Sequence, residues 1–363
     1  MRARPKITFQ GIIYLLLAAA FAYSIYTYRD QLVDIFQILR QGLWLPLLAT
    51  LLVLMVAIYN QATLYASIYR LFELPSLKRE LVPLYLVRRF VTVAAPSGGF
   101  SGWVPVIQFA RRRDIAVGTV FIANLVYTIL WYSTFFVFLL LGLVYLFLSH
   151  DLQWFEISAA LIMLVADLIM IVGLALAWAA PRTLSRVIRW LAVAVEHVSD
   201  WLKRRPPLTP AQFETFATDL TRAVAQMHDR DWRGLLAPVS HALLNETLHI
   251  LMFYLVALAF RVHLHFGVLV AAYSISVLFF VVSPTPGGLG FVEGTLILVL
   301  TTLGVHAHAA TVITLAYRGI TFWLPFILGF AALRWFRRHP GTGGESEEAD
   351  LPLPSSLTAS DDP

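Results

Sequence analysis

The stretch "VVSPTPGGLGFVEG", residues 281–294, decides the fold because it breaks a sequence that is otherwise as apolar as a membrane helix. It holds two prolines, four glycines and the carboxylate of Glu293, whereas its flanks, "FGVLVAAYSISVLFF" and "TLILVLTTLGV", carry no charge. Irregular backbone at membrane depth is tolerated only where protein or a water-filled cavity satisfies its N–H and C=O groups. We therefore expect this break to line a polar cavity.

The composition places the chain among integral membrane proteins. Of its 363 residues, 59% are hydrophobic and 13% are charged, and the mean hydropathy is +0.73. A soluble domain carries about a quarter charged residues. The apolar runs reach about 20 residues, which suits helices that cross the bilayer and not the short alternating strands of a membrane barrel. The predicted fold class is therefore all-α and polytopic. The absence of cysteine excludes disulfides and thiolate metal sites.

Six apolar stretches are long enough to cross about 30 Å of hydrocarbon as helices. They run over residues 7–27, 43–66, 116–148, 155–180, 235–260 and 309–333. Two further apolar regions, 81–113 and 266–304, are interrupted by "AAPSGGFSG" and "SPTPGGLG". Both interruptions contain a proline and a Gly-Gly pair, which is typical of the inverted repeats that build transporter sites at the membrane midplane. We predict six spanning helices plus two opposed re-entrant helical hairpins that form an inverted repeat.

The distribution of basic residues predicts the orientation. Most of the 27 Lys and Arg residues, Arg88 and Arg89 among them, fall on one side of the membrane if the first interrupted region returns to the side that it left. Because basic flanks mark the cytoplasmic side, we expect both termini to be cytoplasmic, in a bacterial or archaeal inner membrane. Residues 1–338 are predicted to form the transmembrane domain, with an amphipathic cytoplasmic linker at 181–234. The polar, Pro-, Gly- and Ser-rich residues 339–363 predict a disordered cytoplasmic tail.

Ionisable residues inside the membrane are candidate functional residues, because a lone charge there costs on the order of 3 kcal/mol or more. Glu293 follows the second interruption, and Arg318 lies in the last span. Two interpretations stay open. The two side chains form a structural ion pair, or Arg318 binds a lipid phosphate, whose oxygens match the planar guanidinium.

A second polar group lies in the span at 235–260. Glu246 and His249 are three residues apart and share a helix face. They predict interhelical hydrogen bonds or, together with Asp167, a polar relay. No second cluster supports a metal site, so no metal is expected. The sequence contains no Walker A motif and no dinucleotide-binding fingerprint, so no cofactor is expected either.

The segment "SPTPGGLGFVEGTLILVLTTLGVHAHAATVITLAYRGITFWLPFILG", residues 283–329, resembles the C-terminal signature of the flippase-like transmembrane family. That family includes the membrane domain of lysylphosphatidylglycerol synthetase/flippase, and a weaker resemblance covers residues 7–335. One departure is that Gly102 is followed by Trp103, where the family commonly has a Gly-Glu pair. The substrate-binding candidates, from this match and from the similar glycine pair in the first interruption, are Pro286, Gly287, Gly288, Gly290, Glu293, Tyr317, Arg318, Ser97, Gly98 and Gly99.

The resemblance implies a lipid flippase or transporter. Its cargo would have a bulky polar or phosphate-containing head, such as an aminoacyl-phosphatidylglycerol, a hopanoid-type lipid or a polyprenyl-linked sugar. The expected partners are membrane lipids and not nucleic acid, and a homo-oligomer stays open. No aminoacyl-transferase domain is recognisable, so enzyme activity is not expected. The alternatives are a membrane-embedded glycosyl- or aminoacyl-lipid transferase and a non-transporting scaffold for lipid synthesis.

Overall fold

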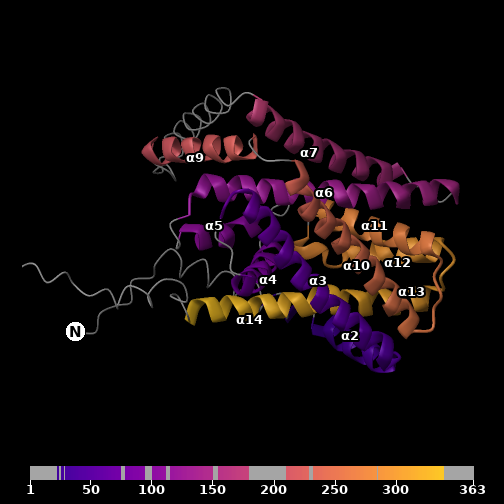
Figure 1. Cartoon of the computed structure of the whole chain (residues 1–363). Coiled ribbons are helices and arrows are strands. Elements are labelled where there is room, and N and C mark those ends of the chain that lie inside the picture. Colours follow the sequence, from indigo (N-terminus) through magenta and orange to yellow (C-terminus); the bar gives the residue numbers. More distant parts are fainter. Residues whose placement is uncertain are drawn as a thin grey trace, which may run out of the picture.

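The computed structural model describes residues 23, 26–27, 29–74, 78–94, 100–111, 115–149, 154–179, 210–228, 232–283 and 285–338 (Figure 1). Within these ranges every regular element is a helix, which confirms the all-α fold class. Four predicted features lie outside the described residues: most of the span at 7–27, the linker before residue 210, the first interruption at 95–99 and the tail at 339–363.

Five helices in the described part are long and apolar enough to cross a membrane. Four of them are α3 (Trp44–Leu71), α6 (Val117–Leu148), α7 (Trp154–Ala179) and α10 (Leu236–Ala259). The fifth runs without a break through α13 (Ala307–Arg318), the π-helix η4 (Gly319–Trp323) and α14 (Leu324–Arg338). These helices coincide with the five predicted spans that the structure describes, so the chain is a polytopic membrane protein.

Each interrupted region forms two short helices around a break. The elements of the first region are α4 (Lys78–Ala94), η1 (Phe100–Gly102) and α5 (Trp103–Arg111), and those of the second are α11 (Phe266–Val282), η3 (Pro286–Gly288) and α12 (Phe291–Thr302). With 9 and 12 residues, α5 and α12 reach about 14 Å and 18 Å, which is too short to cross the hydrocarbon core. Figure 1 shows α5 toward the left end of the long helices and α12 toward the right end.

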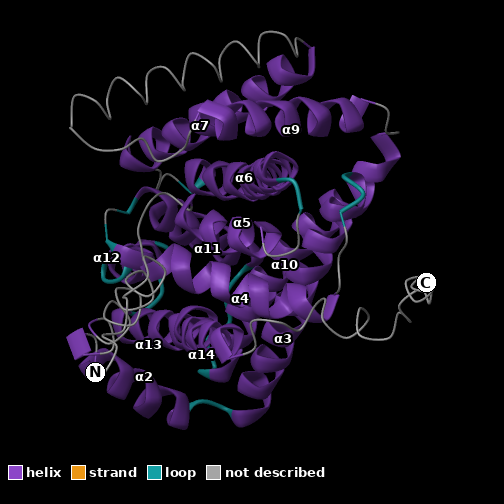
Figure 2. Ribbon diagram, turned by 90° about the vertical axis from the view of Figure 1, so that its left-hand side faces the viewer, coloured by secondary structure: helices purple, strands orange, loops and turns teal. Residues whose placement is uncertain are grey.

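Two further helices flank the spans. Helix α2 (Arg29–Gln41) packs against α13 through the buried side chain of Ile35. Helix α9 (Pro210–His228) begins at a proline and packs on α6, where the ring centroids of Phe121 and Phe216 lie 5.5 Å apart. Figure 2 shows α7 and α9 above α6, and α2 below α13 and α14, so the two flanking helices lie on opposite sides of the bundle.

The most extensive contacts between elements far apart in the sequence are those of α3 with α10, α4 with α14, and α6 with α11. In the first pair, the Asn60 amide donates to the His241 carbonyl at 2.8 Å, and its Oδ1 lies 2.7 Å from His241 Nδ1. In the second pair, Gly329 lies so close to Leu86 that an added Cβ would be 2.4 Å from the Leu86 carbonyl oxygen. Small residues permit such contact between membrane helices, whose association has no hydrophobic driving force in lipid.

Gly329→Ala is expected to push α4 away from α14, because the added Cβ would meet backbone that cannot rotate aside. The free energy of unfolding should fall by ~1–3 kcal/mol, measured as a lower thermal unfolding temperature of the detergent-purified protein. Gly173→Ala in α7 is the matched control, since a Cβ there would have no neighbouring atom within 4 Å. An equal loss in both variants would contradict the close packing of α4 on α14.

Candidate functional site

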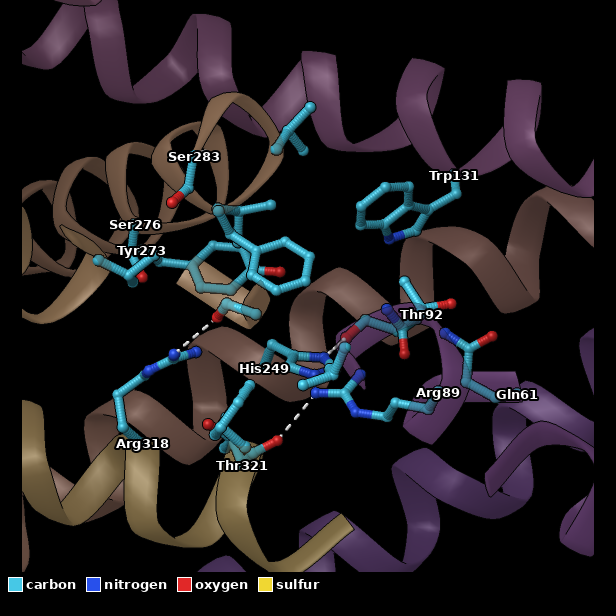
Figure 3. Close-up of a pocket in the computed structure, with 18 of the residues that line it drawn as sticks. Gln61, Arg89, Thr92, Trp131, His249, Tyr273, Ser276, Ser283, Arg318 and Thr321 are labelled. Atoms are coloured by element: carbon cyan, nitrogen blue, oxygen red, sulfur yellow. Dashed lines mark hydrogen bonds between the residues drawn. The ribbon is translucent and has the colours of Figure 1, made fainter. Parts of the chain in front are cut away.

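A cavity of about 220 Å³ lies between the two interrupted regions (Figure 3). Helices α3, α6 and α10 and the last span complete its wall. Figure 3 shows Arg318 and Thr321 on the side of the last span, with Trp131 reaching in from α6 on the far side. The lining residues from the interrupted regions include Tyr85, Arg88, Arg89, Thr92, Tyr273, Ser276, Thr285 and Gly287. The second break therefore lines a cavity, as the sequence predicts.

Three glycines give the second break its shape. Gly287, Gly288 and Gly290 have φ angles of 62°, 71° and 78°, in the left-handed region that side chains disfavour. At Gly287 space is also lacking, because a Cβ would lie 2.6 Å from the Phe322 ring and 2.9 Å from Val93. Since Val93 stands at the end of α4, the second break packs directly against the first interrupted region.

Glu293 and Arg318 form a buried ion pair. Arg318 Nε donates to Glu293 Oε1 at 2.7 Å, and the two side chains are only 7% and 6% exposed. The other carboxylate oxygen, Oε2, accepts the backbone N–H of Gly290 at 2.8 Å, so Glu293 also caps its own helix α12. Arg318 Nη2 donates to the Gly287 carbonyl at 2.9 Å. The structure thus brings the predicted pair together and uses it to hold the break against the last span.

The last span changes its winding at the cavity. Arg318 ends α13, and the following five residues form the π-helix η4. Within η4 the Thr321 carbonyl accepts Arg89 Nη2 at 2.8 Å (Figure 3), while the Phe322 ring packs 4.1 Å from the Arg318 guanidinium carbon. Single π-turns inside α-helices are frequent at functional sites, and here a carbonyl of the π-helix accepts a hydrogen bond from an arginine of α4.

Arg88 and Arg89 are functional candidates that the sequence analysis missed. The distribution of basic residues puts both among the cytoplasmic flanking charges, but both line the cavity. The Arg88 guanidinium carbon lies 4.2 Å from the Tyr127 ring centroid and 5.4 Å from that of Tyr65, and its buried Nε has no hydrogen-bond partner. Arg89 is held by the Thr321 carbonyl and by the Tyr85 hydroxyl at 3.4 Å.

A signal for these residues exists in the sequence. Tyr85, Arg88, Arg89 and Thr92 have the i, i+3, i+4, i+7 spacing of a single helix face. This polar face lies within the interrupted apolar region at 81–113, not beside it. A polar stripe inside a membrane segment indicates a cavity wall, whereas counting charges per flank overlooks it.

The predicted group around Glu246 ties two helices together. Glu246 is 1% exposed, and its Oε2 accepts the Tyr273 hydroxyl at 2.5 Å, which links α10 to α11. Its Oε1 accepts the Asn245 amide at 3.1 Å. His249 lines the cavity and donates from Nδ1 to the Asn245 carbonyl at 2.9 Å. Asp167 in α7 accepts the Ser133 hydroxyl at 2.9 Å and does not line the cavity, so it lies apart from this group.

The predicted substrate-binding residues that the structure describes divide into two sets. Arg318, Tyr317 and Gly287 line the cavity, whereas Glu293, Gly288 and Gly290 support its wall from behind. Ser97, Gly98 and Gly99 and the side chain of Pro286 lie outside the described part of the chain.

The cavity lining is cationic and aromatic. Its charged and aromatic members are Arg88, Arg89, Arg318, His249, Tyr85, Tyr127, Tyr132, Tyr273, Tyr317, Trp131, Phe280 and Phe322. Among the described lining residues there is no aspartate and no glutamate. The described residues also contain no group of three His, Asp or Glu side chains that could hold a metal ion. A lining that offers guanidinium and hydroxyl donors but no negatively charged acceptor suits an anionic ligand.

Neutralising either partner of the ion pair should destabilise the protein. Glu293→Gln leaves Arg318 buried without its carboxylate, and Arg318→Gln leaves Glu293 buried without its guanidinium, so each should cost ~3–5 kcal/mol. The double variant Glu293→Gln with Arg318→Gln should recover much of this loss, since neither charge is left uncompensated. Thermal unfolding of the three variants in one detergent measures the coupling. Additive losses in the double variant would show that the 2.7 Å contact does not couple the two residues.

Comparison with protein-family models agrees with the geometry. Residues 10–329 match the model described as "Lysylphosphatidylglycerol synthase TM region". The match spans the long helices, both interrupted regions and the residues of the cavity, and it confirms the family resemblance seen in residues 283–329. No curated protein and no solved structure matches the chain. Because the matched region covers most of the sequence, this protein belongs to the lysylphosphatidylglycerol synthase transmembrane-region family.

Proposed function

We propose that this protein is a flippase that moves a lipid with a bulky polar or phosphate-containing head across the cytoplasmic membrane. The observation that carries the proposal is the polar cavity of about 220 Å³, whose wall comes from both interrupted regions. The cavity lies among helices whose outer faces expose large apolar side chains, such as Leu140, Leu161 and Ile169. A lipid head would leave water for the cavity while its acyl chains stay in the bilayer.

The pairing of helices supports an inverted repeat. If α3, α4, α5 and α6 correspond to α10, α11, α12 and the last span, the contact of α4 with α14 has its counterpart in that of α11 with α6. In this correspondence, helices α3 and α10 are equivalent elements of the two halves, and they contact each other as a symmetric pair would. Two such halves can expose a site between them to either side of the membrane by rocking against each other, as inverted-repeat transporters do. In our proposal the two interrupted regions are re-entrant hairpins that enter from opposite sides.

A side chain that fills the cavity should stop lipid transfer. Ser276 is 5% exposed and lines the cavity, so Ser276→Phe projects a ring into the space where the head would lie. Leu140→Phe on the outer face of α6 is the matched control, since Leu140 is 47% exposed. The rate at which dithionite reduces fluorescent phosphatidylglycerol in proteoliposomes measures transfer. We expect wild-type and Leu140→Phe proteins to transfer the lipid and Ser276→Phe to fall to the protein-free rate.

The outcomes of this assay separate the proposed function from its alternatives. Transfer by the correctly folded Ser276→Phe variant at the wild-type rate would remove the cavity from the pathway. No transfer by the wild-type protein, for any of several head groups, would favour a transferase or a scaffold.

The orientation can be tested without removing native cysteines, because the chain has none. Glu214 in α9 and His308 at the start of α13 are both exposed, and we propose that they lie on the cytoplasmic and external sides. In intact cells, a membrane-impermeant maleimide should label His308→Cys and should label Glu214→Cys only after the membrane is opened. The reverse labelling pattern would invert the proposed topology. Labelling of both cysteines in intact cells would place the two positions on the same side and contradict the proposed number of spans between them.

A further inference from the structure

We infer that Arg88 and Arg89 form an anion subsite that holds the phosphate of a lipid with a net negative head group, and that the cavity disfavours aminoacylated, cationic head groups. This inference rests on the proposed function, since it names the cargo of the same cavity. It also assigns the phosphate to α4 and not to Arg318, which is already paired with Glu293.

The balance of charge in the cavity wall favours an anionic ligand. Three guanidinium groups line the cavity, and of these three only Arg318 has a carboxylate partner among the described residues. The hydrogen bonds and ring contacts of Arg88 and Arg89 are to tyrosines and to a backbone carbonyl, none of which carries a full negative charge. Arg88 and Arg89 are half-buried, and a charge that is shielded from water without a counter-charge is unfavourable. An anion in the cavity removes this cost, so the protein is built to hold one.

The geometry of the two side chains also favours an anionic ligand. Arg89 is fixed by the Thr321 carbonyl at 2.8 Å, and Arg88 lies against two tyrosine rings that stack on each other at 4.5 Å. Both guanidinium groups are thus held in place before a ligand arrives. Each guanidinium carries a planar fork of N–H donors that matches the oxygens of a phosphate.

The absence of carboxylates from the described lining gives the selectivity. A lysyl or alanyl head group carries an ammonium that needs a negative partner. Glu293 does not line the cavity, and its two oxygens are bonded to Arg318 and Gly290. Glu246 does not line it either, and it is capped by Tyr273 and Asn245. An ammonium in this cavity would meet two arginines without a carboxylate partner, Arg88 and Arg89, and like charges reject a wrong partner.

Binding to the detergent-solubilised full chain tests the inference. The readout is the thermal unfolding temperature during separate titrations with phosphatidylglycerol, lysylphosphatidylglycerol and inorganic phosphate. We expect phosphatidylglycerol to raise it at lower concentration than lysylphosphatidylglycerol. Arg88→Gln and Arg89→Gln should each weaken the apparent affinity for phosphatidylglycerol about ten-fold or more. Arg111→Gln is the matched control, because Arg111 belongs to the same interrupted region but is exposed and lies outside the lining.

A structural role for Arg88 would give a different result. Arg88→Gln would then lower the unfolding temperature without lipid and leave the lipid-dependent increase intact. For an anion subsite, the lipid-free temperature does not fall and the lipid-dependent increase is lost. Arg88→Lys keeps the charge but not the planar fork, and it should give an intermediate affinity. Arg89→Gln and Arg88→Lys keep the test decisive if Arg88→Gln does not fold.

The remaining outcomes separate this inference from the proposed function. Tighter binding of lysylphosphatidylglycerol, or an unchanged affinity for phosphatidylglycerol in both glutamine variants, would overturn the subsite. An arginine-dependent increase with inorganic phosphate alone would retain the anion subsite and identify a free phosphate as its ligand. Arginine-dependent binding of phosphatidylglycerol by a protein that transfers no lipid would retain the subsite and overturn the flippase.

Discussion

The guanidinium of Arg318 holds the second break in place, and the cavity depends on it. It binds Glu293, which caps α12, and the carbonyl of Gly287, whose backbone has a left-handed conformation. In lipid, an open backbone carbonyl or an uncapped helix end costs several kcal/mol (roughly), because no water is available to bond to it. The Arg318 side chain thus satisfies the Gly287 carbonyl in the turn. Through Glu293 it also supports the cap at the start of α12. The irregular backbone can therefore lie at membrane depth and face a cavity.

The other two arginines in the cavity wall have different partners from those of Arg318. Arg318 is neutralised within the protein, whereas Arg88 and Arg89 are supported by aromatic rings, hydroxyls and a carbonyl. Such partners fix the orientation of a guanidinium without cancelling its charge. The arginines therefore have separate roles. Arg318 holds the second break in place, whereas Arg88 and Arg89 leave a positive potential in the cavity between the interrupted regions. A lining without described carboxylates keeps that potential from being cancelled locally.

Much of the fold could be predicted from the sequence, because hydrocarbon imposes simple rules on length and polarity. The described spans, the second break and the proximity of Glu293 to Arg318 all follow from those rules. The charge of the cavity does not follow from them. Arg88 lies 39 residues before Tyr127 in the chain, and only the packing of α4 on α3, which also contacts α6, brings its guanidinium onto the tyrosine rings. Helix α2 was missed because it is short and mixes charged with apolar residues, and no sequence pattern identified the π-helix.

The π-helix also fixes how the last span meets its neighbours on both sides. An α-helix turns by about 100° per residue, so one extra residue in a turn rotates all that follows by about that angle. In this register Arg318 faces the cavity while Gly329, eleven positions later, faces the Leu86 carbonyl of α4. Loss of a single residue between them would place Phe330 against the Leu86 carbonyl in place of the glycine, and gain of one would place Leu328 there. Neither side chain fits, because even a Cβ would be too close. In related chains, insertions and deletions should therefore be absent from this segment, so that its length is constrained as strictly as its composition.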